Sequence, residues 1–116
     1  MKKKLLFIGM VTTLFLTSCS MPKTLYSWGN YDDTSYKYLK NGDEKSTEQL
    51  IETYKQLIEK QTGTRKTVPP GIYADYGFIL LQTGKTEEGK AMLEKEIALY
   101  PESKVFIDQI LNKSEK

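Results

Sequence analysis

Cys19 carries the most reactive side chain in this sequence and is the only cysteine among its 116 residues. Its thiol follows a lysine cluster at positions 2–4 and an apolar run at 5–16. A positive start, an apolar stretch of roughly 7–15 residues and small residues before a cleavage point make up a secretory signal peptide. A membrane-spanning helix would need about 20 apolar residues. The pattern therefore predicts an exported chain from which residues 1–18 are removed.

Leu16, Thr17 and Ser18 stand immediately before Cys19. The four residues resemble the bacterial lipobox, in which an aliphatic residue and two small residues precede an obligatory cysteine. The resemblance implies that the Cys19 thiol carries diacylglycerol and that its new amino group is usually acylated as well. Ser20 stands where a retention Asp holds many such proteins in the inner membrane, which favours the periplasmic side of the outer membrane. The alternative is an ordinary secreted protein with one unpaired cysteine.

The charge balance of the chain changes when the signal is removed. The formal net charge of +2 includes Lys2, Lys3 and Lys4, so the mature chain carries −1. Beyond the signal, Arg65-Lys66 is the only pair of adjacent basic residues. Nucleic-acid binding depends on clustered cations. The sequence therefore predicts no nucleic-acid partner.

Most side chains that enzymes use are missing from the chain. It has no histidine, which removes the usual general base and the commonest metal ligand. A lipid-carrying Cys19 can serve neither as nucleophile nor as metal ligand. Gly84-Lys85-Thr86 resembles the end of a phosphate-binding loop, but Ile79 stands where that motif needs its first glycine. We predict no enzymatic activity, no metal and no cofactor other than the covalent lipid.

Hydrophobic periodicity and turn signals predict an all-α fold. Residues 19–24 are expected to form the lipidated cysteine and a short tether, and residues 25–116 a single helical domain. About five helices in antiparallel hairpins are expected, at 31–40, 47–61, 70–83, 87–100 and 103–113. Asn30, Ser46 and Thr86 are the predicted N-caps, and Gly42 and Gly84 are the predicted helix ends.

The most aromatic part of the chain lies at the start of this domain. It contains one tryptophan and four tyrosines, at Tyr26, Trp28, Tyr31, Tyr36 and Tyr38. On the first helix, one face is expected to carry Tyr31, Ser35, Tyr38 and Leu39. Such rings can form a platform for sugars or peptide prolines, or seal the core of a small domain with their polar tips in water. Some could instead rest on lipid headgroups near the anchor. We favour the core seal and leave the other two open.

The segment Tyr26-Ser27-Trp28-Gly29-Asn30-Tyr31 contains a Tyr-x-Trp-Gly-x-Tyr motif soon after the cysteine. The chain thereby resembles a family of small bacterial lipoproteins of unknown function that open with this motif. The likeness extends to Tyr36, Tyr38 and the proline-rich start of the third helix. Members are often encoded beside lipoproteins of the curli-secretion-pore type. The resemblance implies a role in envelope assembly without identifying the activity.

The third and fourth helices resemble a tetratricopeptide repeat, a helical hairpin of 34 residues. The residues that match its packing positions are Tyr73, Gly77, Gly89, Leu93 and Pro101. The two glycines stand where helix backbones must approach closely. Leu80 in place of a usual tyrosine, and Gly89 in place of alanine, depart from the pattern. The final helix is the expected cap over the apolar face that a repeat leaves exposed.

These patterns together predict a lipid-anchored adaptor that binds another envelope protein. The partner could be a lipoprotein of the curli-secretion-pore type, with the adaptor supporting assembly of an outer-membrane or secretion complex. One alternative is a structural subunit built permanently into such a complex. Another is a small peptidoglycan- or sugar-binding module that uses Trp28 and the tyrosines.

Overall fold

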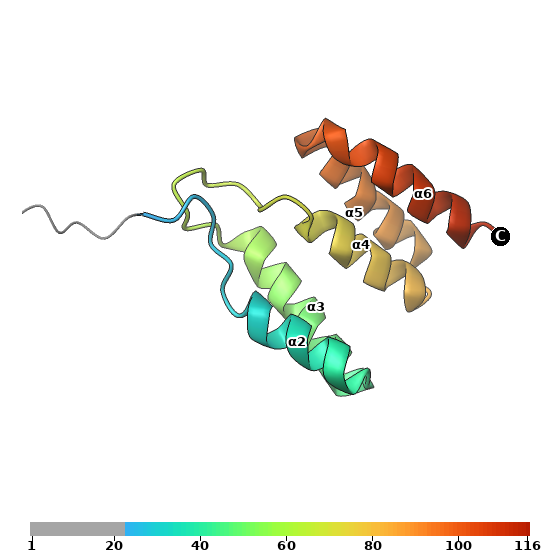
Figure 1. Ribbon diagram of the computed structural model, residues 1–116, viewed down its shortest axis with the longest axis horizontal. Helices are drawn as coiled ribbons and strands as arrows, with labels where there is room; N and C mark the ends of the chain where they lie inside the picture. The colour runs from blue at the N-terminus through green and yellow to red at the C-terminus, as the bar shows by residue number, and fades with distance from the viewer. Residues whose placement is uncertain (1–22) are drawn as a thin grey trace, which may run out of the picture.

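The computed structural model describes residues 23–116, so the predicted signal peptide, the lipobox and Cys19 lie outside the described part of the chain. The all-α prediction is confirmed, because the described residues form five α-helices and one short 3₁₀ helix, with no strand (Figure 1). Their bounds are α2 Tyr31–Asn41, α3 Glu44–Glu59, α4 Ile72–Gln82, α5 Thr86–Leu99, η1 Pro101–Ser103 and α6 Lys104–Ser114. None of the helices between residues 23 and 116 has the length and apolar character needed to cross a bilayer.

The first hairpin pairs α2 with α3 through a very short turn. Gly42 ends α2 in the left-handed region, at φ +59°, and its N–H donates to the Tyr38 carbonyl. The predicted capping box at Ser46 is wrong, because α3 begins at Glu44, one turn earlier than the sequence pattern indicated. The carboxylate of Asp43 caps the helix instead and accepts a hydrogen bond of 2.8 Å from the Ser46 N–H. Ser46 is therefore a buried residue of the first turn.

The other two predicted caps occupy the helix starts without capping them through their side chains. Asn30 stands at the N-cap of α2, but its side chain makes no capping hydrogen bond. Thr86 is the first residue of α5, whose N-cap position is occupied by Lys85. Acidic residues in the first turns of both helices remain favourable to the helix dipoles. The predicted stop at Gly84 is confirmed by its φ of +86°.

The second hairpin, α4 with α5, is built on the two glycines that the repeat resemblance singled out. A Cβ atom placed on Gly77 would lie 2.8 Å from the Gly89 carbonyl oxygen, and one on Gly89 would lie 2.8 Å from the Gly77 carbonyl oxygen. No side chain fits between these backbones, so the two helices meet at main-chain distance. Leu93 is buried beside this contact, and Tyr73 is partly buried on the other core.

Helix α6 covers the second hairpin as the sequence predicted for a cap. Ile107 is fully buried against Ala74 and Leu93, with Leu111 packed at the edge of the same cluster. Pro101, the expected last residue of the repeat, is exposed and begins η1. The outer face of α6 leaves Val105 and Phe106 exposed.

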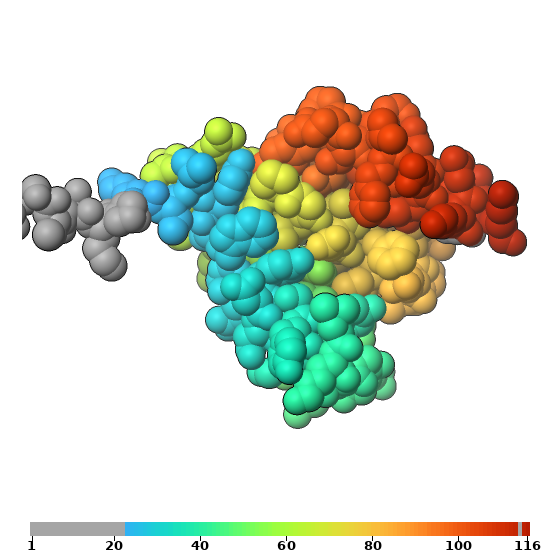
Figure 2. All heavy atoms as spheres, viewed as in Figure 1, coloured from blue at the N-terminus to red at the C-terminus, as the bar shows by residue number. Residues whose placement is uncertain are grey.

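The long connection between the hairpins holds the N-terminal segment. We call residues 23–27 the strap and residues 60–66 the loop. The Thr64 N–H donates to the Thr24 carbonyl at 3.0 Å, and the Arg65 N–H donates to the Leu25 carbonyl at 3.1 Å. Figures 1 and 2 show the strap and the loop side by side at one end of the molecule. Helix α2 begins after the strap, and α3 ends before the loop. Thr24, the last residue of the expected tether, thus already belongs to the folded body.

Helix α4 joins two hydrophobic clusters and is the central element of the fold (Figure 1). The larger cluster combines α3, the connection and α4, through Leu50, Tyr54, Leu57, Val68, Ile72, Tyr76, Ile79 and Leu80. The smaller cluster joins α4 to α5 and α6. Because α4 contributes to both, it is buried on two sides and is the most apolar helix of the described chain.

Candidate functional site

A row of aromatic rings runs from the surface into the larger core. Trp28 lies 5.6 Å from Tyr31, Tyr31 lies 6.0 Å from Tyr54, and Tyr54 lies 5.6 Å from Tyr76, measured between ring centroids. All three pairs are tilted, an arrangement that favours contact between ring edges and faces. The row connects the segment before α2 to α2, α3 and α4. Part of the predicted aromatic cluster therefore packs against the core, through Tyr31 and Tyr38, whereas Trp28 is 41 % exposed at the outer end of the row.

One side of this row is open and forms what we call the aromatic groove. It is a hollow of about 200 Å³ between α2, α3 and α4, lined by Tyr31, Ser35, Tyr38, Leu39, Leu50, Tyr54, Asp75, Phe78 and Ile79. The four residues that the sequence placed on one face of α2 all line it. Leu39 is 80 % exposed and Phe78 is 42 % exposed at its rim. The groove thus presents apolar side chains to solvent above a floor of buried ones.

Polar groups stand at the walls of the aromatic groove. The Tyr31 hydroxyl donates to Asp75 Oδ2 at 3.0 Å, and the Tyr38 hydroxyl lies 3.5 Å from Gln82 Oε1. Partial burial, together with the neighbouring Asp75 carboxylate, raises the pKa of Tyr31 to about 12. Desolvation raises the pKa of the Asp75 carboxyl, although the hydrogen bond from Tyr31 acts in the opposite direction. The groove therefore presents a solvent-accessible carboxylate at its wall, which favours a cationic partner.

Three of the five predicted aromatic residues do not line the groove, and one of them, Trp28, is the outer ring of the aromatic row. Tyr36 is 62 % exposed, with the Lys40 ammonium 5.8 Å from its ring centroid. Tyr26 belongs to the strap, where the Arg65 guanidinium lies 5.8 Å from its ring centroid and also donates to its hydroxyl at 3.3 Å. The sequence cluster is consequently divided among a core row, an exposed tyrosine and a loop contact.

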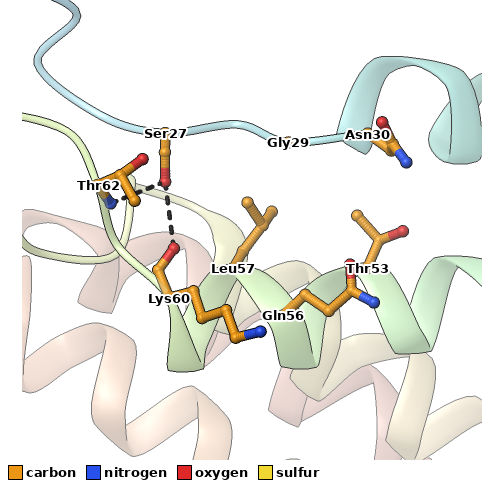
Figure 3. A pocket seen from close by; sticks show the side chains of 8 residues that line it. All are labelled: Ser27, Gly29, Asn30, Thr53, Gln56, Leu57, Lys60 and Thr62. Carbon is orange, nitrogen blue, oxygen red and sulfur yellow. Dashed lines mark hydrogen bonds between the residues drawn. The ribbon is translucent and has the colours of Figure 1, made fainter.

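A second hollow, which we call the polar pocket, lies between the segment before α2 and the C-terminal half of α3 (Figure 3). It has a volume of about 430 Å³ and is lined by Ser27, Gly29, Asn30, Thr53, Gln56, Leu57, Lys60 and Thr62. The Ser27 hydroxyl donates to the Lys60 carbonyl at 3.3 Å and accepts from the Thr62 N–H at 3.3 Å. The side chains of Asn30, Gln56 and Lys60 make no hydrogen bond with other residues of the range 23–116. They are therefore available to a polar ligand.

The sequence analysis missed a buried carboxylate on α5. Glu96 is 0 % exposed, although the other carboxylates of α5 are exposed. Its Oε1 accepts hydrogen bonds from the Gly71 N–H at 2.8 Å and the Ser103 hydroxyl at 3.3 Å. Glu96 thus ties the start of α4 to η1. The signal was present in the spacing, since Gly89, Leu93 and Glu96 fall on one helical stripe.

The two hollows differ in the groups that they offer to a binding partner. Between residues 23 and 116, no group of three or more acidic side chains gathers in a way that could hold a metal ion. The aromatic groove offers apolar surface with one carboxylate, and the polar pocket offers hydroxyl, amide and ammonium groups.

The fold and these two hollows define a small all-α protein of two helical hairpins with a covering helix. Residues 25–110 match the family model described as Domain of unknown function (DUF4810), so the chain belongs to that family. No curated protein matches the chain. No solved structure matches it.

Proposed function

We propose that this chain is a lipid-anchored adaptor on the periplasmic side of the outer membrane, where it binds another envelope protein through the aromatic groove. Two lines of argument support the proposal. The first is the sequence around Cys19, which resembles a lipobox. The second is the groove, an apolar hollow of about 200 Å³ between the two hairpins with the Asp75 carboxylate at its wall.

The exposure of Leu39 and Phe78 beside a carboxylate is the observation that carries this proposal. Exposed apolar residues are ordinary when single, but a group of them around a hollow marks a contact surface. The hollow accommodates a large apolar side chain between Tyr38 and Phe78. Asp75 at the wall favours a lysine or arginine beside that side chain. The partner is thus an apolar segment with an adjacent cation.

We propose an envelope lipoprotein of the curli-secretion-pore type as the partner, with the adaptor supporting assembly of an outer-membrane or secretion complex. A structural subunit built permanently into such a complex is the rival form of the same idea. The two differ in reversibility. An adaptor dissociates from the complex as a soluble folded monomer, whereas a permanent subunit self-associates when it is released.

Site-specific photocrosslinking in intact membranes tests the adaptor proposal. A photoreactive amino acid is placed at Leu39 or Phe78, and matched controls carry it at Leu99 or Phe106, which are also exposed. We expect one crosslinked envelope protein from the groove positions and a much weaker yield from the controls. Adding Asp75→Asn should reduce the yield at the groove positions. Equal yields from all four positions would contradict the proposal.

A sugar- or peptidoglycan-binding module is a second candidate, and the polar pocket is the observation that favours it. The side chains of Asn30, Gln56 and Lys60, which make no hydrogen bond within residues 23–116, line this pocket (Figure 3), and Trp28 stands two positions before Asn30 in the sequence. Aromatic rings beside such polar groups are typical of saccharide sites. Trp28 is the only tryptophan of the chain, so a change in tryptophan fluorescence would report binding beside this residue. A titration with cell-wall fragments that leaves the emission unchanged would exclude this candidate.

A further inference from the structure

The strap and the loop form one end of the molecule and are bonded together along their backbones. Besides the two ladder-like hydrogen bonds from Thr64 and Arg65, the Ser27 N–H donates to Gln61 Oε1 at 3.4 Å. A Cβ atom on Gly63 would lie 2.5 Å from the Leu25 carbonyl oxygen. The loop therefore presses against the strap at main-chain distance. The point where the chain enters the folded body is fixed at this end.

Positive charge is concentrated at this same end. Residues 20–30 and 60–74 contain four cations and no acidic residue, the cations being Lys23, Lys60, Arg65 and Lys66. The mature chain has a net charge of −1, so everything outside these two segments carries −5. The ion pairs among residues 23–116 join Lys37 to Asp33 and Lys104 to Asp108, and neither involves these four cations. We call the four residues the basic end.

The basic end contains a shallow hollow that could hold an anion, in addition to its excess of positive charge. Lys23 and Lys66 flank a hollow of about 430 Å³ that is otherwise lined by Thr24, Thr62, Gly63 and Thr64. The Lys66 N–H donates to the Gly63 carbonyl at 3.0 Å, which closes a tight turn and leaves Lys66 at φ +50°. The neighbouring Arg65 is held in place against the Tyr26 ring. Ammonium, guanidinium and hydroxyl groups together suit phosphate oxygens.

Chain length places this end next to the predicted lipid anchor. Five residue steps separate Cys19 from Thr24, and at roughly 3.3–3.6 Å per residue they span at most about 18 Å. The helices extend away from the basic end, because α2 starts beside the strap and runs from Tyr31 to Asn41 (Figure 1). Leu39 is close to the C-terminal end of α2, the end farther along the chain from the strap.

We propose that the basic end docks on anionic phospholipid headgroups of the membrane that holds the anchor. This inference rests on the proposed lipid anchoring through Cys19. The −5 charge of the remaining chain is repelled by the same anionic surface, so the body takes one orientation instead of lying on its side. The rim of the aromatic groove then faces away from the bilayer. The lipid anchor attaches the chain to the membrane, and the basic end sets the orientation of the folded body on its surface.

Lysine modification on the lipidated chain tests the orientation. The chain is extracted from membranes and reconstituted into vesicles of phosphatidylcholine alone or with phosphatidylglycerol, and an amine-reactive reagent is applied. We expect Lys23, Lys60 and Lys66 to react about fivefold more slowly on the anionic vesicles, with recovery at high salt. The matched lysines Lys45, Lys55 and Lys85, which are exposed elsewhere on the body, should change less than about twofold.

The outcomes separate this inference from the anchoring on which it rests. A chain that does not remain with either kind of vesicle overturns the anchoring. A chain that remains with both, but shows equal reactivity for the two groups of lysines, overturns the docking of the basic end. As a second measurement, we expect Arg65 to react more slowly with an arginine-specific reagent on anionic vesicles than on neutral ones. The triple variant K23Q/K60Q/K66Q should lose this slowing. The triple variant K45Q/K55Q/K85Q should retain it, and equal behaviour of the two variants contradicts the proposal.

Discussion

The two hairpins of this chain pack their helices through different contacts: backbone against backbone in one, and aromatic ring against aromatic ring in the other. In α4 and α5, Gly77 and Gly89 remove the side chains at the crossing, so the backbones touch and a single arrangement fits. In α2 and α3, bulky rings hold the helices together, with Tyr31 against Tyr54 at 6.0 Å. Helices in backbone contact leave no space between them. Helices held apart by aromatic rings leave hollows at their surface, such as the aromatic groove. The C-terminal hairpin is therefore the scaffold, and the N-terminal hairpin is the adaptable surface.

The position of the buried carboxylate follows the same division. The scaffold encloses Glu96 completely and uses it to join Gly71 and Ser103. The N-terminal hairpin instead keeps the hydroxyls of Tyr31 and Tyr38 at the edge of its groove. A buried carboxylate with two donors rigidifies its surroundings. Groups at a groove edge can exchange their partners for those of a ligand.

The substitution Gly77→Leu should have the largest effect, because it places a side chain between two touching backbones. We expect a loss of about 3 kcal/mol in the free energy of unfolding, seen as a melting temperature lower by on the order of 10–20 °C. Ala91→Leu adds a similar change in volume at an exposed position of α5 and is the control. If both variants melt alike, the close approach of α4 and α5 is contradicted.

Replacing Glu96 tests the second feature of the scaffold. Glu96→Ala leaves the Gly71 N–H without its acceptor and should cost about 2 kcal/mol. Glu96→Gln retains an oxygen acceptor in the same place and should cost less than about 1 kcal/mol. Chemical denaturation of both variants at neutral pH measures the difference. Equal losses would show that the hydrogen bonds to Glu96 do not stabilise the junction.

Gly63→Ala examines the contact between the loop and the strap. The added methyl group would lie 2.5 Å from both the Leu25 carbonyl oxygen and the Tyr26 Cα atom, so the strap must move. We expect a loss of about 1–2 kcal/mol and a shift in the fluorescence of Trp28, which follows the strap in sequence. Thr62→Ala, at the neighbouring exposed position, should leave the emission unchanged. An unchanged Trp28 emission in Gly63→Ala would contradict the close contact between the loop and the strap.

The smallest expected effect concerns alkaline pH and the aromatic row. The pKa of Tyr31 is raised to about 12, chiefly by burial, while an unfolded tyrosine ionises near 10. The folded state thus binds more protons between these values, so this contribution to stability is complete below about pH 10 and is lost as the pH rises towards 12. Burial also raises the pKa of Tyr54. Tyr31→Phe should reduce the fall in stability, whereas Tyr36→Phe should not; identical profiles would contradict the account.

The sequence predicted the scaffold better than the adaptable surface, for a physical reason. Gly77, Gly89 and Leu93 act through local helical spacing, which a sequence displays directly. The capping box at Ser46 failed because Asp43, three residues earlier, offers a stronger acceptor and starts the helix sooner. Local signals compete, and the sequence alone does not rank them.

The candidate site depended more on distant contacts. The face of α2 that lines the groove was predictable from its 3.6-residue period. Asp75 and Phe78 were not, because they reach the groove from another hairpin. The strap was equally hidden, since its partners in the loop lie about 40 positions further along the chain. Contacts of this kind become visible only once the hairpins are placed.

Hydrogen exchange of backbone amides, measured on the chain anchored in vesicles, tests the division between scaffold and adaptable surface most directly. We predict that the amides of α2 exchange at least about tenfold faster than those in the middle of α4 and α5, because ring contacts open locally more easily than backbone contacts. Comparable protection of α2, α4 and α5 would contradict the account.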